Sequence, residues 1–346
     1  MPGSGSLARS TAPATRRSNL ASVGKGAVRP CARARSGISV QGGNDWERNA
    51  GRSSLQGVRS RELGQNFLQN RRTARRVAHL AGGDPDLLCV DLGAGNGSIT
   101  DAALLRSGPI CAIEVDKRLA QRLRQRFEAE PRVTVVEADL TAATPPSVPF
   151  VIAANPPFNL STLLVRRWVA AEHFQSGALI VERPFAGRVS GGFGATKLSI
   201  SLGAYVAMAV PFDVRPAEFN PRPRVDAAIL TASRRVDAPL PWAERASYWT
   251  LVNYLFERGR HTVGEAIEQL AISGVPNAVR RLPIREITVE DAVELHRHVS
   301  AVDRCRPLLD RFESSLPVSR QVTLGDLIPE GSRPNQTQRR GGSNRR

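Results

Sequence analysis

The sequence has few of the features that mark secreted, metal-binding or membrane proteins. It contains 4 cysteines in 346 residues, and they lie too far apart to form a CxxC pair or a tight cluster with histidine. The sequence therefore predicts no metal site and no disulfide framework, and unpaired thiols fit a reducing compartment. No apolar run approaches the roughly 20 residues that cross a bilayer, which excludes a membrane-spanning protein.

Acidic residues are absent from the first 44 positions, which are rich in Arg, Ser and Ala. That composition is typical of an organelle transit peptide, and a basic RNA-binding arm explains it as well. No apolar segment of the kind found in secretory signals accompanies it, so secretion is not predicted. We favour the arm and keep organelle import as the alternative.

The net charge of +16 is concentrated at the two ends of the chain. Residues 1–60 carry ten Lys/Arg and two Asp/Glu, and residues 317–346 carry six and two. Ends rich in Gly, Ser, Pro and Arg cannot bury enough apolar surface to offset the entropy of ordering them. The sequence therefore predicts a disordered basic arm over residues 1–58 and a disordered basic tail over 317–346, both suited to phosphate contact. A merely solvated surface is the alternative.

Between these ends the chain can bury a core, because 41% of all residues are hydrophobic. Residues 59–236 contain short apolar runs separated by helix-length gaps, and Leu119, Leu123 and Phe127 follow the spacing of one amphipathic helix. Apolar runs that alternate with helices are typical of a parallel sheet covered on both faces. We predict a doubly wound, mostly parallel α/β sheet with an antiparallel pair at its edge. The expected strands are Leu87–Leu92, Ile110–Val115, Val133–Val136, Phe150–Ala154 and Ala178–Val181, and the edge pair is Tyr205–Val210 with Ala227–Leu230.

Residues 240–316 have a helical pattern, which predicts a small second domain. Thr288 with Asp291 forms a capping box that would open one helix, and Pro307 would end it. Two earlier helices are expected from the i, i+3, i+4 spacing of apolar residues: Tyr248, Leu251, Val252, Leu255 and Phe256 in one, and Ala266, Ile267, Leu270 and Ala271 in the other.

Three features in order along the predicted strands indicate a nucleoside site. Gly93, Gly95 and Gly97 follow the first strand in a GxGxG turn, which lets the backbone pass close to a ligand. Glu114 ends the second strand, where an acid can accept both ribose hydroxyls, and Asp139 follows the third, where a carboxylate can accept from an adenine amino group. Ligands of open α/β sheets bind at this edge. The spacing is not that of dinucleotide enzymes, so we expect S-adenosylmethionine as the cofactor.

The fourth strand ends in Asn155-Pro156-Pro157-Phe158. An exocyclic amine on an aromatic base is a poor nucleophile, because its lone pair is delocalised into the ring. We expect the Asn155 side-chain oxygen and the Pro156 carbonyl to accept both amino hydrogens and so to aim the lone pair at a methyl donor. In-line positioning would then supply most of the acceleration. Phe158 is suited to stacking on a base that has left its helix.

These segments together resemble the rRNA adenine N6-methyltransferases, over about residues 60–310. The matching stretches are LGQNFL at 63–68, the GAGNG turn, AIEVD at 112–116, EADL at 137–140, ANPPF at 154–158 and FNPRPRVD at 219–226, with a weaker RGRHT at 258–262. Within that superfamily the chain is most similar to the erythromycin-resistance (Erm) methyltransferases of actinomycetes. Those enzymes methylate one adenine of 23S rRNA and so block macrolides, lincosamides and streptogramin B.

The resemblance implies roles for particular residues. Asn66 and Leu68 would contact the cofactor, Gln65 would support the same pocket, and Gly93, with Gly95 in the same turn, would lie against its methionine part. It also implies a cytoplasmic bacterial protein that binds ribosomal RNA, with a monomer as the default. Two adjacent arginines, Arg166 and Arg167, are expected on a helix, where phosphate contact and a solvated face are about equally favoured.

Three other interpretations stay open at this point. A housekeeping or organellar small-subunit rRNA dimethyltransferase would fit the transit-like start, but those enzymes usually read Asn-Leu-Pro-Tyr where this chain reads Asn-Pro-Pro-Phe. The same motif resembles that of DNA adenine methyltransferases. A non-catalytic RNA-binding factor on this fold is the third, and the intact Gly93, Glu114, Asp139 and Asn155 argue against it.

Removal of residues 1–55 is expected to weaken RNA binding and to flatten its dependence on salt, because this segment carries most of the positive charge of the predicted arm. The measurement is the RNA dissociation constant over a series of salt concentrations, for the full chain and the truncated chain. A salt slope that does not change on truncation would contradict the prediction.

Overall fold

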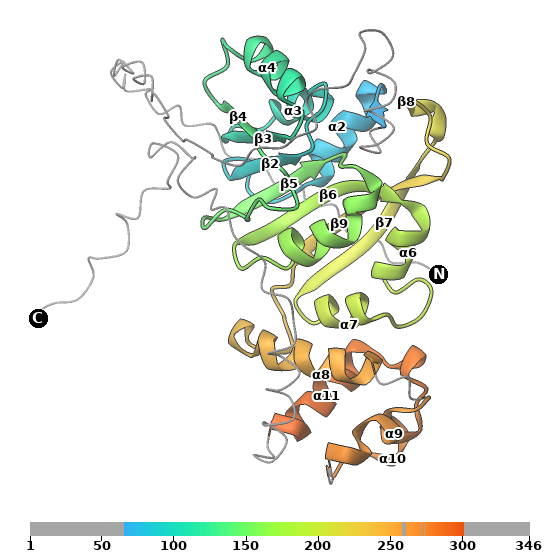
Figure 1. Cartoon of the computed structure of the whole chain (residues 1–346). Helices are drawn as coiled ribbons and strands as arrows, with labels where there is room; N and C mark the ends of the chain where they lie inside the picture. The colour runs from blue at the N-terminus through green and yellow to red at the C-terminus, as the bar shows by residue number, and fades with distance from the viewer. Residues whose placement is uncertain (1–65, 258–260, 271, 273, 301–346) are drawn as a thin grey trace, which may run out of the picture. The chain divides into compact units, whose positions relative to one another are not determined.

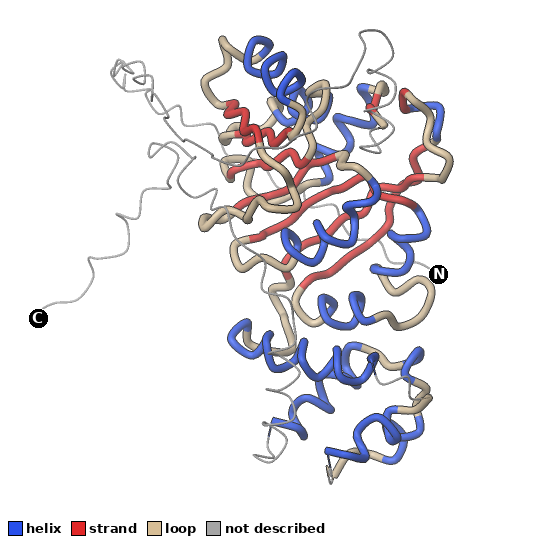
Figure 2. Tube along the Cα trace, viewed as in Figure 1, coloured by secondary structure: helices blue, strands red, loops and turns tan. Residues whose placement is uncertain are grey.

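The computed structural model describes residues 66–257, 261–270, 272 and 274–300, and the predicted basic arm and tail lie outside these ranges. Its main feature is a seven-stranded sheet in the order β4-β3-β2-β5-β6-β9-β7, with helices on both faces (Figures 1 and 2). The strands are β2 (Leu88–Leu92), β3 (Ile110–Glu114), β4 (Val133–Glu137), β5 (Phe150–Ala154), β6 (Phe174–Glu182), β7 (Val206–Val214) and β9 (Ala227–Arg234).

The first five strands of this sheet run parallel, as the sequence predicts. Every residue of β2, β3 and β5 is buried, because helices cover both of their faces. β9 then inserts antiparallel between β6 and β7, and β7 forms the free edge. The doubly wound, mostly parallel fold with an antiparallel edge pair is therefore confirmed. β6 begins four residues before the expected Ala178, and β7 continues to Val214 rather than ending at Val210.

Two sets of helices cover the two faces of the sheet. Strand side chains alternate between the faces, so Cys89 packs in a core with Val77 of α2, while Val90 packs in another with Trp168. On the Cys89 side lie α2 (Arg71–Leu80), α3 (Ser98–Ala103) and α4 (Lys117–Arg126). On the Val90 side lie α5 (Ser161–Leu164), the π-helical turn η2 (Val165–Val169), α6 (Arg183–Val189) and α7 (Lys197–Gly203).

A group of helices follows the sheet, in the region where the sequence predicts them. They are α8 (Arg245–Glu257), α9 (Val263–Ile267), α10 (Asn277–Arg281) and α11 (Val289–Ser300). Thr288 and Asp291 cap α11 as expected, because the Asp291 backbone N–H donates to Thr288 Oγ1 at 3.1 Å and the Thr288 N–H donates to Asp291 Oδ2 at 3.0 Å. The buried Tyr248 hydroxyl on α8 donates to the Ile200 carbonyl of α7 at 3.0 Å.

Two expectations about this region cannot be compared with the structure, because Ala271 and Pro307 are outside the described residues. The sequence did not indicate the short α10. Within the described ranges, every helix is too short or too polar to cross a lipid bilayer.

Among the described residues Trp168 is the largest fully buried side chain, and its ring lies edge-on to Phe150 with centroids 6.3 Å apart. Replacement of Trp168 by Ala is expected to lower the free energy of unfolding by about 3–5 kcal/mol, because a large cavity would remain. Trp168→Phe should cost much less, since the indole N–H is buried and none of the described residues accepts a hydrogen bond from it. Urea unfolding followed by circular dichroism measures both.

The matched control is Leu105→Ala, because the Leu105 side chain is 75% exposed and its loss should change stability by less than about 0.5 kcal/mol. Equal losses for Trp168→Ala and Leu105→Ala would contradict the expected burial.

Candidate functional site

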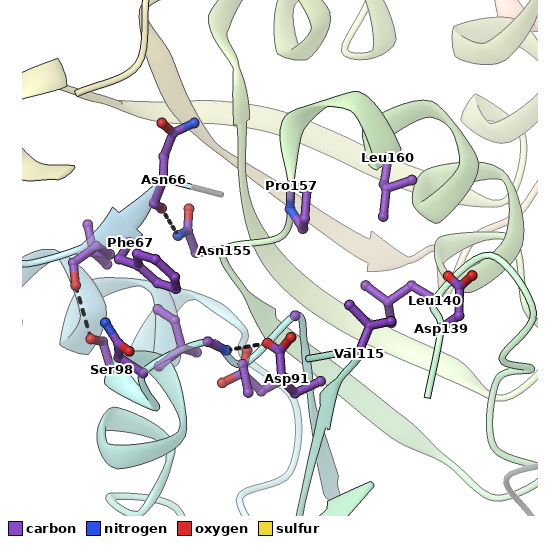
Figure 3. Close-up of a pocket in the computed structure, with 17 residues that line it drawn as sticks. Asn66, Phe67, Asp91, Ser98, Val115, Asp139, Leu140, Asn155, Pro157 and Leu160 are labelled. Atoms are coloured by element: carbon purple, nitrogen blue, oxygen red, sulfur yellow. Dashed lines mark hydrogen bonds between the residues drawn. The ribbon is translucent and has the colours of Figure 1, made fainter. Parts of the chain in front are cut away.

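A pocket opens at the carboxyl ends of β2, β3 and β5, where a ligand of an open α/β sheet binds (Figure 3). Seven of the eight residues predicted to bind a cofactor line it, and the eighth, Gln65, lies outside the described residues. The seven come from five separate segments: Asn66, Leu68, Gly93, Gly95, Glu114, Asp139 and Asn155. The structure therefore brings these residues together, and their individual roles stay predictions.

The glycine turn after β2 lies in close contact with two other walls of the pocket. Gly93 and Gly95 both have positive φ, at +79° and +56°. A Cβ at Gly93 would lie 3.2 Å from Cδ of Pro157, and a Cβ at Gly95 would lie 3.1 Å from the Phe67 ring. Any other residue would be strained at these φ values and would push the walls apart.

The wall on the Asn66 side is a small antiparallel sheet that the sequence did not reveal. β1 (Phe67–Leu68) pairs with β8 (Phe219–Asn220), although about 150 residues separate them. Ser98 at the start of α3 adds a side-chain hydrogen bond of 3.0 Å to the Leu68 carbonyl. The end of the LGQNFL stretch thus pairs with the start of the FNPRPRVD stretch. Phe67 and Ser98 join the residues that line the pocket.

The pocket is lined by three carboxylates, and no Lys, Arg or His is among its described lining residues. Both oxygens of Glu114 accept backbone N–H bonds of 2.8 Å, one from Gly95 and one from Asp116. Burial raises the pKa of the Glu114 carboxyl, and these two bonds oppose that rise. Asp139 is exposed at the rim and accepts from the Thr141 N–H at 2.8 Å. Such a pocket favours a ligand that carries positive charge.

Asp91 is a lining carboxylate that the sequence analysis did not select. It is 1% exposed, and its Oδ2 accepts from the Thr100 hydroxyl at 2.7 Å. Oδ1 is buried and accepts no hydrogen bond from a described residue. Burial is the main cause that raises the pKa of Asp91 to about 7, and the nearby Glu114 raises it further. The available signal was an acid inside an otherwise apolar strand.

In the side-chain amide of Asn155, at the end of β5, the nitrogen forms a hydrogen bond with a described residue and the oxygen does not. Its Nδ2 donates to the Asn66 carbonyl at 2.9 Å (Figure 3). Because a carbonyl can only accept, this bond fixes which end of the amide is the oxygen. Oδ1 is buried, and no described residue donates to it. A buried acceptor without a donor is costly, so a ligand donor is the expected partner.

The other two predicted catalytic residues lie beside the pocket rather than among its lining side chains. Pro156 is buried, and no described residue donates a hydrogen bond to its carbonyl. Phe158 is partly buried, with its ring edge-on to Phe219 of β8 at a centroid separation of 6.2 Å. Pro157 and Leu160, which flank Phe158, do line the pocket.

The RGRHT stretch is only partly described. Residues 258–260 are outside the described ranges, and Thr262 accepts from the Glu265 N–H as the N-cap of α9. His296 and His298 both lie on α11. In the described part of the chain, no group of three or more His, Cys, Asp or Glu is placed to hold a metal ion.

Residues 58–303 match the protein-family model described as "Ribosomal RNA adenine dimethylase". Among solved structures, the "23S rRNA methyltransferase ErmE" is similar with a TM-score of 0.59 and 24% identity, over 68% of this chain and 100% of that one. That similarity shows the shared fold.

Three curated relatives with different names are similar to this chain in sequence. An rRNA adenine N-6-methyltransferase of Saccharopolyspora erythraea is 30% identical over 197 residues, which is 57% of this chain and 52% of the relative. Mycinamicin-resistance protein MyrB of Micromonospora griseorubida is 32% identical, over 52% of this chain and 57% of the relative. Ribosomal RNA small subunit methyltransferase A of Geobacter sulfurreducens is 30% identical, over 64% of this chain and 84% of the relative. The chain thus spans about half the length of the first of these relatives.

Substitution of Asp91 by Asn is expected to reduce the pH dependence of stability between about pH 4 and pH 7. Its folded-state pKa of about 7 lies above the ordinary 3.8, so the folded chain binds this proton more tightly. The stabilisation is fully present below about pH 4 and is lost as the pH rises through about 7. Urea unfolding at a series of pH values measures it. Asp86→Asn, at an exposed site, is the control, and parallel profiles for Asp91→Asn and the parent chain would show the prediction wrong.

Proposed function

Because the chain belongs to the ribosomal RNA adenine dimethylase family, we propose that it transfers a methyl group from S-adenosylmethionine to the N6 amine of an adenine in ribosomal RNA. The observation that carries the proposal is the buried Oδ1 of Asn155, an acceptor without a donor at the end of β5. It lies on the same pocket as Glu114 and Asp139, which are suited to a ribose and an adenine.

The residues of the pocket fit this cofactor better than a dinucleotide. A pyrophosphate is negatively charged, whereas the described lining holds three carboxylates and no basic side chain. A sulfonium and an amino group are both cationic, so the same carboxylates favour them. The enclosed part of the pocket measures about 70 Å³, which is below the roughly 300–1,000 Å³ of typical ligand sites. The cofactor would therefore extend into the open space beside it.

The end of β5 is suited to activating an aromatic amine. Bound S-adenosylmethionine supplies an electrophilic methyl group on sulfur. Asn155 Oδ1 and the Pro156 carbonyl are two acceptors without described donors, on adjacent residues. Together they would accept both hydrogens of an N6 amine and hold its lone pair out of conjugation with the ring. The methylated nitrogen is a strong acid, so its extra proton passes to water and no buried base is required.

For the substrate, we propose 23S rRNA, with resistance to macrolides, lincosamides and streptogramin B as the outcome. This rests on the Asn155-Pro156-Pro157-Phe158 motif and on relatives that include a mycinamicin-resistance protein. The second candidate is dimethylation of small-subunit rRNA. It is favoured by the relative from Geobacter sulfurreducens, which this chain matches over 84% of its length. Both reactions place the protein with ribosomes, and we expect it in the bacterial cytoplasm.

The deciding experiment is primer extension on 23S and 16S rRNA from a macrolide-sensitive host that expresses the protein, together with erythromycin susceptibility. Mass spectrometry of the target fragment distinguishes one methyl group from two. A new 23S modification with resistance is the expected result. Modification of 16S rRNA alone, in a host that lacks its own dimethyltransferase, would move the substrate to the small subunit, and no modification of either RNA would overturn the proposal.

Asn155→Ala is expected to lower the rate of methylation at least about 100-fold, because the amine loses the acceptor that positions it. Asn155→Asp should also be slow, since it keeps an oxygen but loses the Nδ2 bond to the Asn66 carbonyl. Single-turnover transfer from radiolabelled S-adenosylmethionine measures the rate. The control is Asn159→Ala, at an exposed position in the following turn. Full activity of Asn155→Ala would support a non-catalytic role for the site.

A further inference from the structure

A second cavity, of about 470 Å³, lies between α5, η2, α6, α7 and α8. This volume is within the roughly 300–1,000 Å³ typical of small-molecule sites. Thr162, Arg166 and Ala170 line one side at a spacing of four residues, which places them on one face of the α5–η2 segment. The other walls come mainly from α6, α7 and α8, and they include Arg188, Lys197, Trp249 and Asn253.

The charge of this cavity is opposite to that of the first pocket. Arg166, Arg188 and Lys197 are among its described lining residues, and no Asp or Glu is. Arg166 and Arg188 are exposed, and no described residue accepts a hydrogen bond from either guanidinium. Two guanidinium groups without partners and a third cation around one cavity indicate an anionic ligand, and guanidinium groups match the geometry of phosphate.

Trp249 provides the cavity with a fixed aromatic wall. Its Nε1 donates to the Ser201 carbonyl at 2.6 Å. Its ring lies edge-on to Trp242 at 6.1 Å and to Tyr205 at 6.4 Å, centroid to centroid. The indole is therefore held before any ligand arrives, and only part of it is exposed. A held aromatic ring is suited to stacking on a nucleobase, and stacking tolerates any base.

Asn253 is the observation that points to a polar ligand in the same cavity. Its side chain lines the cavity and the residue is 8% exposed, yet no described residue forms a hydrogen bond with its carboxamide. The residue is buried as a whole, but its amide atoms are not among the buried atoms without a partner, so they open onto the cavity and are available to a ligand or to water. A carboxamide offers both donors and an acceptor, which matches the edge of a base.

The two cavities share one short segment of chain. Pro157 and Leu160 line the first pocket, and Thr162 and Arg166 line the second. Arg166 follows Leu160 by six residues, or about 9 Å along a helix. A polynucleotide whose target base lies at Asn155, at the edge of the first pocket, would therefore bring a neighbouring nucleotide to the second.

We propose that the second cavity binds an unpaired nucleotide of the substrate RNA that flanks the target adenine, a proposal that rests on the proposed function. Its phosphates lie against Arg166 and Arg188, its base lies against Trp249, and Asn253 bonds to the edge of the base. The cavity thereby selects RNA in which the target lies within a single-stranded stretch.

The test compares Arg166→Ala/Arg188→Ala with Arg118→Ala/Arg122→Ala, which removes two exposed arginines from α4 on the opposite face of the sheet. The substrate is a transcript of the 23S segment that the parent chain modifies. The cavity variant is expected to raise the KM for RNA at least about 10-fold and to reduce the salt slope of RNA binding by about 1.4, which corresponds to two single-strand phosphates. Its kcat and its affinity for S-adenosylmethionine should not change.

A second variant and a modified RNA test the base contact. Asn253→Asp keeps the size of the side chain but places negative charge in the cavity, so it should raise the KM for RNA like the double variant. An abasic site at one flanking position should weaken binding to the parent chain at least about fivefold. The same abasic site should cost the Arg166→Ala/Arg188→Ala variant little, because the nucleotide is no longer held.

The outcomes separate the two proposals. If the parent chain methylates the transcript but both cavity variants match the α4 control in KM and salt slope, the cavity assignment is wrong and the methyltransferase stands. If abasic sites weaken the parent and the cavity variants equally at every position, the base contact is wrong. If the parent chain methylates no ribosomal RNA, both proposals fail together.

Discussion

The close contact between the glycine turn and the end of β5 is the constraint on which the site depends. Gly93 lies against Pro156 and Pro157 so tightly that a single Cβ would come within 3.2 Å of the second proline. That contact places the loop which holds Glu114, through the Gly95 N–H, beside the strand end which carries Asn155. The glycine turn and the end of β5 are about 60 residues apart in the sequence, and they line one pocket because Gly93 has no side chain to hold them apart.

The two cavities carry opposite charge, and the segment from Pro157 to Arg166 contributes residues to both. The first pocket holds Asp91, Glu114 and Asp139 and favours a cationic small molecule. The second holds Arg166, Arg188 and Lys197 and favours a polyanion. Each set of charges would repel the ligand that the other attracts, so a phosphate backbone is disfavoured at the first pocket. The helical segment from Pro157 to Arg166 lies between the negatively charged pocket and the positively charged cavity.

Much of this arrangement could be predicted from the sequence, because local patterns determine it. Buried strands such as Ile110–Glu114 are continuous apolar runs, and their carboxyl ends carry the polar residues. The rest depends on contacts between distant segments. Nothing near Phe67 indicates that it pairs with Asn220. Nothing near Asn253 indicates a cavity, because an amide on a helix is usually solvated. The sequence shows that Asp91 is an acid, but it does not show that its Oδ1 is buried without a hydrogen-bond donor among the described residues.

The position of β9 between β6 and β7 has a consequence for synthesis of the chain. β9 ends at Arg234, so the sheet remains without its seventh strand until the ribosome has released that residue. The wall that pairs Leu68 with Phe219 also waits for the later segment. Long-range pairing of this kind forms late in folding. A nascent chain that already carries every described lining residue of the first pocket, from Asn66 to Leu160, therefore still lacks the strand that pairs with its Phe67–Leu68 wall.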